Sequence, residues 1–131
     1  MKLFVYGTLM RGECNEERLR GARFIGVDCT PPIYSLVNLG PYPGLIEAGT
    51  TAVHGEVYEI DDVLLAALDA FEEHPDVYLR TMIDLESRQS AFAYVLRPEH
   101  AAAATPLARG DWRQRPAIEV PWDVGPLHGL K

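Results

Sequence analysis

The hydrophobic and polar positions of the chain mostly follow the period of β-strands. Lys2–Tyr6 is apolar and aromatic and stops at Gly7, which predicts a short buried strand that leads into a loop. Arg23–Cys29 and Ile33–Val37, on either side of a pair of prolines, predict two further strands. Ala52–Ile60 predicts another, in which a glycine marks a bulge or a close approach of a neighbouring backbone.

Two segments in the second half of the chain predict a β-hairpin. The odd positions of Val77–Leu85 are mostly apolar, so we expect their side chains to form one face of a long strand. Ala91–Leu96 supplies the partner strand, and Pro98 ends the hairpin. Closer to the N-terminus, the glycines and prolines of Gly40–Gly44 predict a rigid turn.

Two segments have the pattern of helices. In Val63–Glu73, leucines and a phenylalanine recur at helical spacing behind Asp61 and Asp62, which suit a helix N-terminus. Asn15–Arg20 is short and charged and is followed by Gly21, a common stop signal. The sequence therefore predicts one clear helix and one short one.

The predicted strands outnumber the helices and are joined by short turns. This indicates an α+β fold built on a mostly antiparallel sheet or small barrel. A chain of 131 residues, 47% of them hydrophobic, can bury one core, so we expect a single domain over residues 1–131. Glu99–Lys131 is poorly determined by its pattern and contains a possible strand at Ile118–Val120.

Charge and composition argue against several classes of function. The net charge is -7 and no basic cluster is present, so nucleic acid is not an expected partner. The chain has no apolar stretch that could span a bilayer, and its apolar start is too short for a signal peptide. We therefore expect no membrane association and a cytoplasmic location, with Cys14 and Cys29 reduced. The oligomeric state stays unknown at this stage.

Glu72 is the leading candidate for acid–base chemistry. It follows Phe71 at the edge of the apolar stripe of the predicted helix, so its carboxylate should point toward the core. Glu73 and Asp69 are turned away from that stripe, which leaves Glu72 as the acid whose pKa burial could raise. The same pattern also fits a carboxylate that reaches solvent or pairs with Arg80.

Other candidate sites have weaker patterns. Gly7–Leu9 directly follows a strand, where backbone N–H groups and a hydroxyl can hold an anion, although a glycine needed only for the turn gives the same pattern. His54 and Glu56 are the closest pair of potential metal ligands, and we expect no metal site from a pair alone. Several aromatic residues are expected to be half-buried packing residues, namely Tyr42, Tyr58, Tyr78, Tyr94, Trp112 and Trp122.

Three motifs in chain order show a family resemblance. They are Tyr6-Gly7-Thr8-Leu9, Leu68-Asp69-Ala70-Phe71-Glu72 and Tyr78-Leu79-Arg80. Together they resemble the γ-glutamyl cyclotransferase-like superfamily, over the chain from Lys2 to about Leu96. The longer runs most similar to its γ-glutamylamine cyclotransferase, or avirulence-induced-protein-like, branch are Val5–Gly12, Gly55–Tyr58 and Phe71–Thr81.

The resemblance implies a compact mixed β-barrel with flanking short helices, a pocket at its mouth and neither a metal nor an organic cofactor. It implies that Glu72 is the catalytic general acid and base for a small-molecule γ-glutamyl substrate, whose own α-amine attacks its side-chain carbonyl and releases 5-oxoproline. A non-catalytic module that binds an amino-acid-like ligand is the alternative. The implied substrate-binding residues and pocket walls are Tyr6, Gly7, Thr8, Leu9, Tyr78 and Tyr94.

Two features depart from the pattern of the family. Glu73 stands where many relatives have a small residue, and the segment between Gly40 and Thr51 is short. Both are expected to affect the rim of the pocket and therefore the leaving amine that it accepts.

Overall fold

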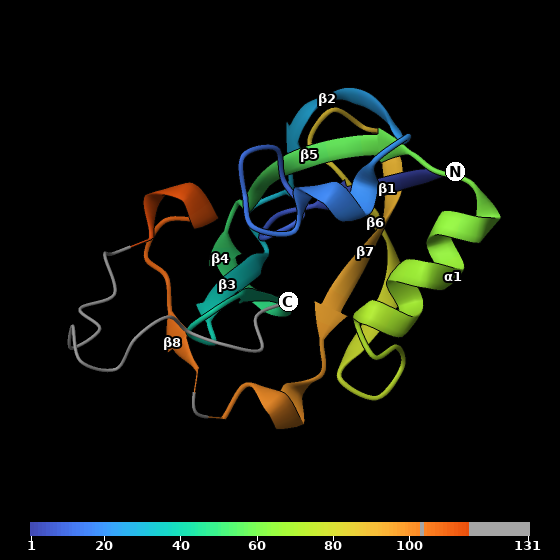
Figure 1. The fold of residues 1–131 in the computed structure, drawn as a ribbon. Helices are drawn as coiled ribbons and strands as arrows, with labels where there is room; N and C mark the ends of the chain where they lie inside the picture. The colour runs from blue at the N-terminus through green and yellow to red at the C-terminus, as the bar shows by residue number, and fades with distance from the viewer. Residues whose placement is uncertain (103, 116–131) are drawn as a thin grey trace.

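The computed structural model of the protein describes residues 1–102 and 104–115. The possible strand at Ile118–Val120 lies outside these residues. Figure 1 shows the strands gathered centrally, with one long helix along a side. The strands are β1 (Lys2–Val5), β2 (Arg23–Cys29), β3 (Tyr34–Asn38), β4 (Pro43–Thr51), β5 (His54–Glu59), β6 (Tyr78–Asp84), β7 (Ser90–Leu96) and β8 (Thr105–Pro106).

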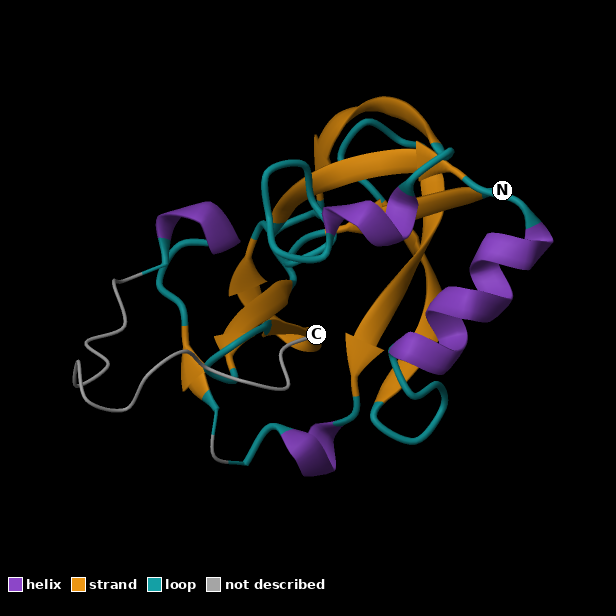
Figure 2. Cartoon of the chain, in the orientation of Figure 1, coloured by secondary structure: helices purple, strands orange, loops and turns teal. Residues whose placement is uncertain are grey.

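The helical elements lie outside the sheet (Figure 2). The long helix, α1, spans Asp62–Phe71, and short 3₁₀ turns cover Glu16–Leu19, Pro98–His100 and Trp112–Gln114. Within the described part of the chain, we find no helix that is both long and apolar enough to cross a bilayer.

The strands form one mixed sheet. Its order is β2-β5-β1-β7-β4-β3-β8, and β6 pairs with β7 outside this path. The β1–β7 and β4–β7 pairs are parallel, whereas the pairs β1–β5, β2–β5, β3–β4, β3–β8 and β6–β7 are antiparallel. The mixed, mostly antiparallel α+β fold is therefore confirmed. The closed barrel is not, because the described strands form an open path from β2 to β8.

Two strands share one edge of β7. Since β6 pairs along the whole of β7 on one side, β1 and β4 must lie on the other. β1 pairs there with Leu3 opposite Phe92, and β4 pairs further along with Leu45 opposite Val95. If β1 continued in the same register, Tyr6 would lie opposite Val95 of β7, the residue that already pairs with Leu45 of β4. The chain therefore has to leave the sheet after β1, and it does so at the point where β4 begins.

The helix α1 begins and ends close to its predicted bounds. The Asp61 carboxylate accepts a hydrogen bond from the Leu64 N–H at 2.8 Å and so caps the N-terminus. Leu68 is buried against the sheet core. The helix stops at Phe71 rather than Glu73, and Glu72 becomes its C-cap.

Gly55 is required by a close approach, one of its two predicted explanations. A Cβ atom at this position would lie 2.3 Å from the carbonyl oxygen of Val5 and 2.7 Å from the ring of Phe4. The register irregularity lies instead in the neighbouring strand β2, between Phe24 and Gly26. Gly55 thus allows β5 to pack tightly on β1.

Two strand predictions need correction. β4 begins inside the predicted rigid turn, with Pro43 as its first residue, a position at which a strand tolerates proline. In β6, the odd positions do not form a uniform buried face, since Tyr78 is buried while Leu79 is 37% exposed. Tyr78 turns inward because it faces a pocket, described below, rather than the solvent.

The segment predicted as a short helix at Asn15–Arg20 is a 3₁₀ turn over Glu16–Leu19. The Asn15 side chain does not cap this turn, and its amide donates to the hydroxyl of Thr8 at 3.1 Å. Both cysteines are free thiols, as expected.

Candidate active site

A pocket lies where β1 and β4 part along β7. The space that the centre of a water molecule can occupy is about 40 Å³, so the pocket is narrow. Its walls include all the site residues that the sequence singled out, Tyr6, Gly7, Thr8, Leu9, Glu72, Tyr78 and Tyr94. They also include four others, Phe4, Val5, Tyr42 and Pro43.

The loop after β1 is held tightly against β4. A Cβ atom on Gly7 would lie 2.5 Å from Cγ of Pro43, so a glycine is needed for this approach. The Met10 N–H donates to the Gly7 carbonyl at 3.1 Å and closes a turn. Thr8 is buried, and its carbonyl accepts from the Asn15 N–H at 2.9 Å. The backbone of Gly7–Leu9 therefore has a defined shape at the wall of the pocket.

The Tyr6 side chain, which follows β1, links β7 and β4 at the pocket. Its hydroxyl donates to the carbonyl of Tyr94 on β7 at 2.5 Å and accepts from the N–H of Leu45 on β4 at 3.1 Å. Burial raises the pKa of Tyr6 well above its usual range, and the negative charge of Glu72 adds to the effect. Tyr6 thus stays neutral, and its hydroxyl bridges the main chains of β7 and β4.

Tyr78 and Tyr94 also donate their hydroxyl protons to protein acceptors. The Tyr78 hydroxyl donates to the Pro43 carbonyl at 2.7 Å, and the Tyr94 hydroxyl donates to Asp69 Oδ1 at 2.7 Å. Burial raises the pKa of each far above the usual range, and for Tyr94 the hydrogen bond to Asp69 adds to it. Because a phenol has one proton, these three tyrosines shape the pocket without a proton left to give.

Glu72 places a carboxylate in this pocket. Glu72 is only 9% exposed, whereas Glu73 is exposed. This confirms the prediction that Glu72, and not Glu73, is turned toward the core. The negative charge of Glu72 contributes to the raised pKa values of Tyr6, Tyr78 and Tyr94. After Glu72, the backbone turns into the left-handed region at Glu73, with φ 54°, and leaves the helix. Glu72, the C-cap residue, thus lines the same pocket as the three tyrosines.

Asp69 and Arg80 form a separate pair beside the pocket. The Arg80 guanidinium donates to Asp69, and both side chains are half-buried. The backbone N–H of Arg80 donates to Nδ1 of His74 at 3.0 Å. Arg80, which the sequence suggested as a partner of Glu72, thus pairs with Asp69. Asp69 in turn orients Tyr94.

Sequence reasoning missed Tyr42 and Pro43 as pocket walls. Both were assigned to a rigid turn or to packing, and no local pattern distinguishes them. They reach the pocket because β4 joins β7 at a point remote in sequence. The register of that parallel pair was not visible in either strand alone.

The potential metal ligands do not assemble into a site. Among residues 1–102 and 104–115, no group of three or more His, Cys, Asp or Glu side chains lies close enough to hold a metal ion. The Glu56 carboxylate instead accepts hydrogen bonds from Arg11 and Tyr58.

Comparisons with known proteins agree with the motifs. The model of the family described as gamma-glutamyl cyclotransferase, AIG2-like, matches residues 3–114. The gamma-glutamylcyclotransferase family protein YtfP of Escherichia coli is 38% identical over 116 residues, 88% of this chain and 98% of that protein. Gamma-glutamylaminecyclotransferase B of Danio rerio is 34% identical over 138 residues, 98% of this chain and 71% of that protein.

The fold also matches a solved structure. The crystal structure of an AIG2-like protein of Mus musculus superposes with a TM-score of 0.64 at 32% identity, and the match covers 99% of this chain and 92% of that one.

Proposed function

The chain belongs to the gamma-glutamyl cyclotransferase, AIG2-like family, and from this we propose that it converts γ-glutamyl amines or γ-glutamyl peptides into 5-oxoproline and a free amine. Glu72 is the general acid and base of this reaction. The supporting observation is the buried Glu72 carboxylate, which shares a narrow pocket with three tyrosines whose hydroxyl protons are engaged elsewhere.

In the proposed reaction, the substrate supplies its own nucleophile. Glu72 takes a proton from the α-ammonium group, and the freed amine attacks the γ-carbonyl carbon to form the carbon–nitrogen bond of a five-membered lactam. The ring nitrogen of the tetrahedral intermediate loses its second proton to solvent, and the bond to the leaving nitrogen breaks as that nitrogen receives the proton from Glu72. The released amine then takes up one proton from solvent. General acid–base catalysis of this kind contributes about a hundred- to ten-thousand-fold to the rate.

The loop after β1 binds the α-carboxylate of the substrate in this proposal. Backbone N–H groups of a tight turn suit an anion, and the contact of Gly7 with Pro43 brings this turn to the pocket wall. Tyr78 and Tyr94 are walls that keep the glutamyl chain curled, which favours attack of its amine on its own carbonyl.

The experiment is a substrate panel. Purified protein is incubated with γ-glutamyl-ε-lysine, γ-glutamyl-α-amino acids and glutathione, and 5-oxoproline is quantified by mass spectrometry, with Glu72→Gln as the background. Release by the wild type alone is the expected result, and the preferred substrate identifies the leaving amine. If the folded wild type binds these compounds without releasing 5-oxoproline, the enzyme proposal fails and the pocket is a non-catalytic binding module.

A further inference from the structure

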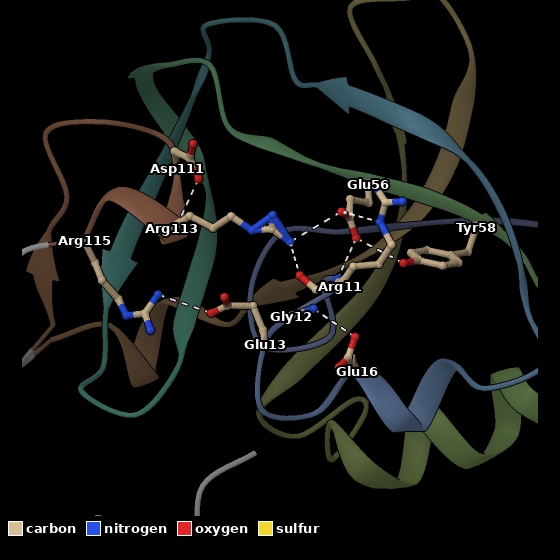
Figure 3. A network of polar contacts seen from close by, with 9 residues as sticks. All are labelled: Arg11, Gly12, Glu13, Glu16, Glu56, Tyr58, Asp111, Arg113 and Arg115. Carbon is tan, nitrogen blue, oxygen red and sulfur yellow. Dashed lines mark hydrogen bonds and ion pairs between the residues drawn. The ribbon is translucent and has the colours of Figure 1, made fainter.

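A second buried glutamate lies at the centre of the network in Figure 3. Glu56 on β5 is 3% exposed, and its Oε1 accepts from the Arg11 N–H at 2.9 Å and from the Tyr58 hydroxyl at 3.1 Å. Its Oε2 accepts from Nε of Arg11 at 3.2 Å and from the Arg113 guanidinium at 3.4 Å. Four donors, two of them cationic, thus converge on one carboxylate.

This network fixes Arg11 through its backbone and its side chain. The N–H of Arg11 donates to Glu56, and its carbonyl accepts from the Arg113 guanidinium. Its own guanidinium lies over the ring of Phe24, with its central carbon 3.7 Å from the ring centroid. Both polar groups of the Arg11 backbone therefore have partners from distant parts of the chain.

Arg113 reaches this loop from a short turn near the end of the described chain. The carboxylate of Asp111 accepts from the Arg113 N–H at 3.0 Å and caps the 3₁₀ turn Trp112–Gln114. From the same segment, Arg115 donates to Glu13 Oε1 at 3.3 Å. Figure 3 shows both arginines extending toward the loop that follows β1.

The turn Gly7–Met10, which binds the substrate carboxylate in the proposed function, lies between two residues that are fixed by hydrogen bonds. On its N-terminal side, Tyr6 is fixed to β7 and β4 by its hydroxyl. On its C-terminal side, Arg11 is fixed by Glu56 and Arg113. The turn closed by Met10 spans the few positions between these two residues, and Gly7, Thr8 and Leu9 of this turn line the pocket, so a shift of Arg11 is transmitted to the pocket wall.

We propose that Arg113 is a positioning residue that holds the turn Gly7–Met10 in the shape that binds the substrate carboxylate. It acts through the Arg11 carbonyl and through Glu56, and it touches no substrate atom. The role in binding rests on the proposed function, whereas the role in loop geometry does not. A segment about a hundred residues downstream thereby sets the affinity of the pocket.

Hydrogen exchange tests the loop geometry without any ligand. Arg113→Ala should raise the exchange rates of the backbone amides of Gly7–Met10 at least about tenfold, because the local opening becomes easier. Arg109→Ala is the matched control, since Arg109 lies in the same segment and donates to Gln114 rather than to the loop. Unchanged exchange in Arg113→Ala, with overall protection intact, overturns the proposal.

Steady-state kinetics test the effect on binding. A carboxylate contact is present in both the ground state and the transition state, so Arg113→Ala should raise KM about tenfold and leave kcat within about twofold. Arg113→Lys, which keeps the charge, should show an intermediate KM, and Arg109→Ala should match the wild type. A fall in kcat at constant KM contradicts a positioning role in binding.

The two proposals fail in distinguishable ways. A wild type that releases no 5-oxoproline removes the proposed function, and the exchange experiment still decides whether Arg113 holds the loop. An active wild type with an Arg113→Ala variant of unchanged KM and unchanged exchange removes only the present inference.

Discussion

Glu72 and Glu56 are both buried carboxylates, yet their surroundings differ in kind. Glu56 faces two guanidinium groups, a backbone N–H and a phenol, so its charge is compensated within the protein. Glu72 lines the pocket, and its charge acts on three tyrosines whose pKa values it helps to raise. Burial alone therefore does not mark the candidate catalytic acid. The set of neighbours and the adjoining pocket distinguish it.

The largest expected effect is on turnover. Glu72→Gln keeps the shape of the side chain but removes proton transfer, so kcat should fall by about a hundred- to ten-thousand-fold. Release of 5-oxoproline measures it, with circular dichroism as the check on folding. The exposed neighbour provides the control, because Glu73→Gln should stay close to the wild type. A folded Glu72→Gln variant with near-wild-type turnover would exclude Glu72 as the general acid and base.

The second effect is on stability. Here the substitution of Glu56 is expected to have the larger effect, and that of Glu72 the smaller. Glu56→Gln removes the negative charge shared by Arg11 and Arg113, whose side chains are 58% and 38% exposed, so the free energy of unfolding should fall by about 2 kcal/mol. Urea unfolding followed by tryptophan fluorescence measures this loss. Glu72→Gln keeps the shape of a side chain that lines a pocket, so in the same assay it should change the free energy of unfolding by less than Glu56→Gln does. Equal losses in both variants would contradict the distinction between the two sites.

The smallest expected effect is on the pH dependence of stability. It concerns Asp28, a partly exposed carboxylate with which the two buried glutamates can be compared. Burial alone would raise its pKa, but hydrogen bonds from Ser87, Gln89 and the Cys29 N–H outweigh burial and lower it. A carboxylate with a lowered folded pKa adds stability above its unfolded pKa and loses it as the pH falls through the folded value.

Asp28→Asn should therefore reduce the free energy of unfolding by less than about 1 kcal/mol at neutral pH. The difference from the wild type should shrink below about pH 4, where the unfolded carboxylate takes up its proton. Urea titrations at several pH values measure it. A difference that grows with acidity would show that the sign assigned to the Asp28 shift is wrong.

Much of the fold was predictable because its signals are local. The sequence predicted β2 and the β6–β7 hairpin within about two residues, because runs of strand-type residues and the prolines that bound them are local signals. The cap at Asp61 marked the start of α1 in the same way. β4 was hidden because its first residue is Pro43 and its second half is polar and exposed, which resembles a loop. The path of the sheet needed pairings between distant strands, so an open sheet and a barrel were equally compatible with the sequence.

The candidate site was predictable to the same extent. The motif of residues 6–9 and Glu72 are each contiguous with a strand or helix, and the structure brings them to one pocket. The contacts of Arg113 with the Arg11 carbonyl and the Glu56 carboxylate had no sequence signal, because they join residues 102 and 57 positions apart in the chain. An arginine in a polar segment has many possible partners, and only the packed chain selects one.

The shared edge of β7 also limits how this architecture can adapt to ligands of other sizes. A strand changes length in whole residues, about 3.3 Å each, and every added residue turns the next side chain to the opposite face. A change in strand length therefore cannot alter the space between β1 and β4 in steps smaller than one residue. We therefore expect proteins with this fold to keep β1 and β4 constant in length and to tune their substrate range through pocket side chains outside these two strands, such as the one at the position of Tyr42.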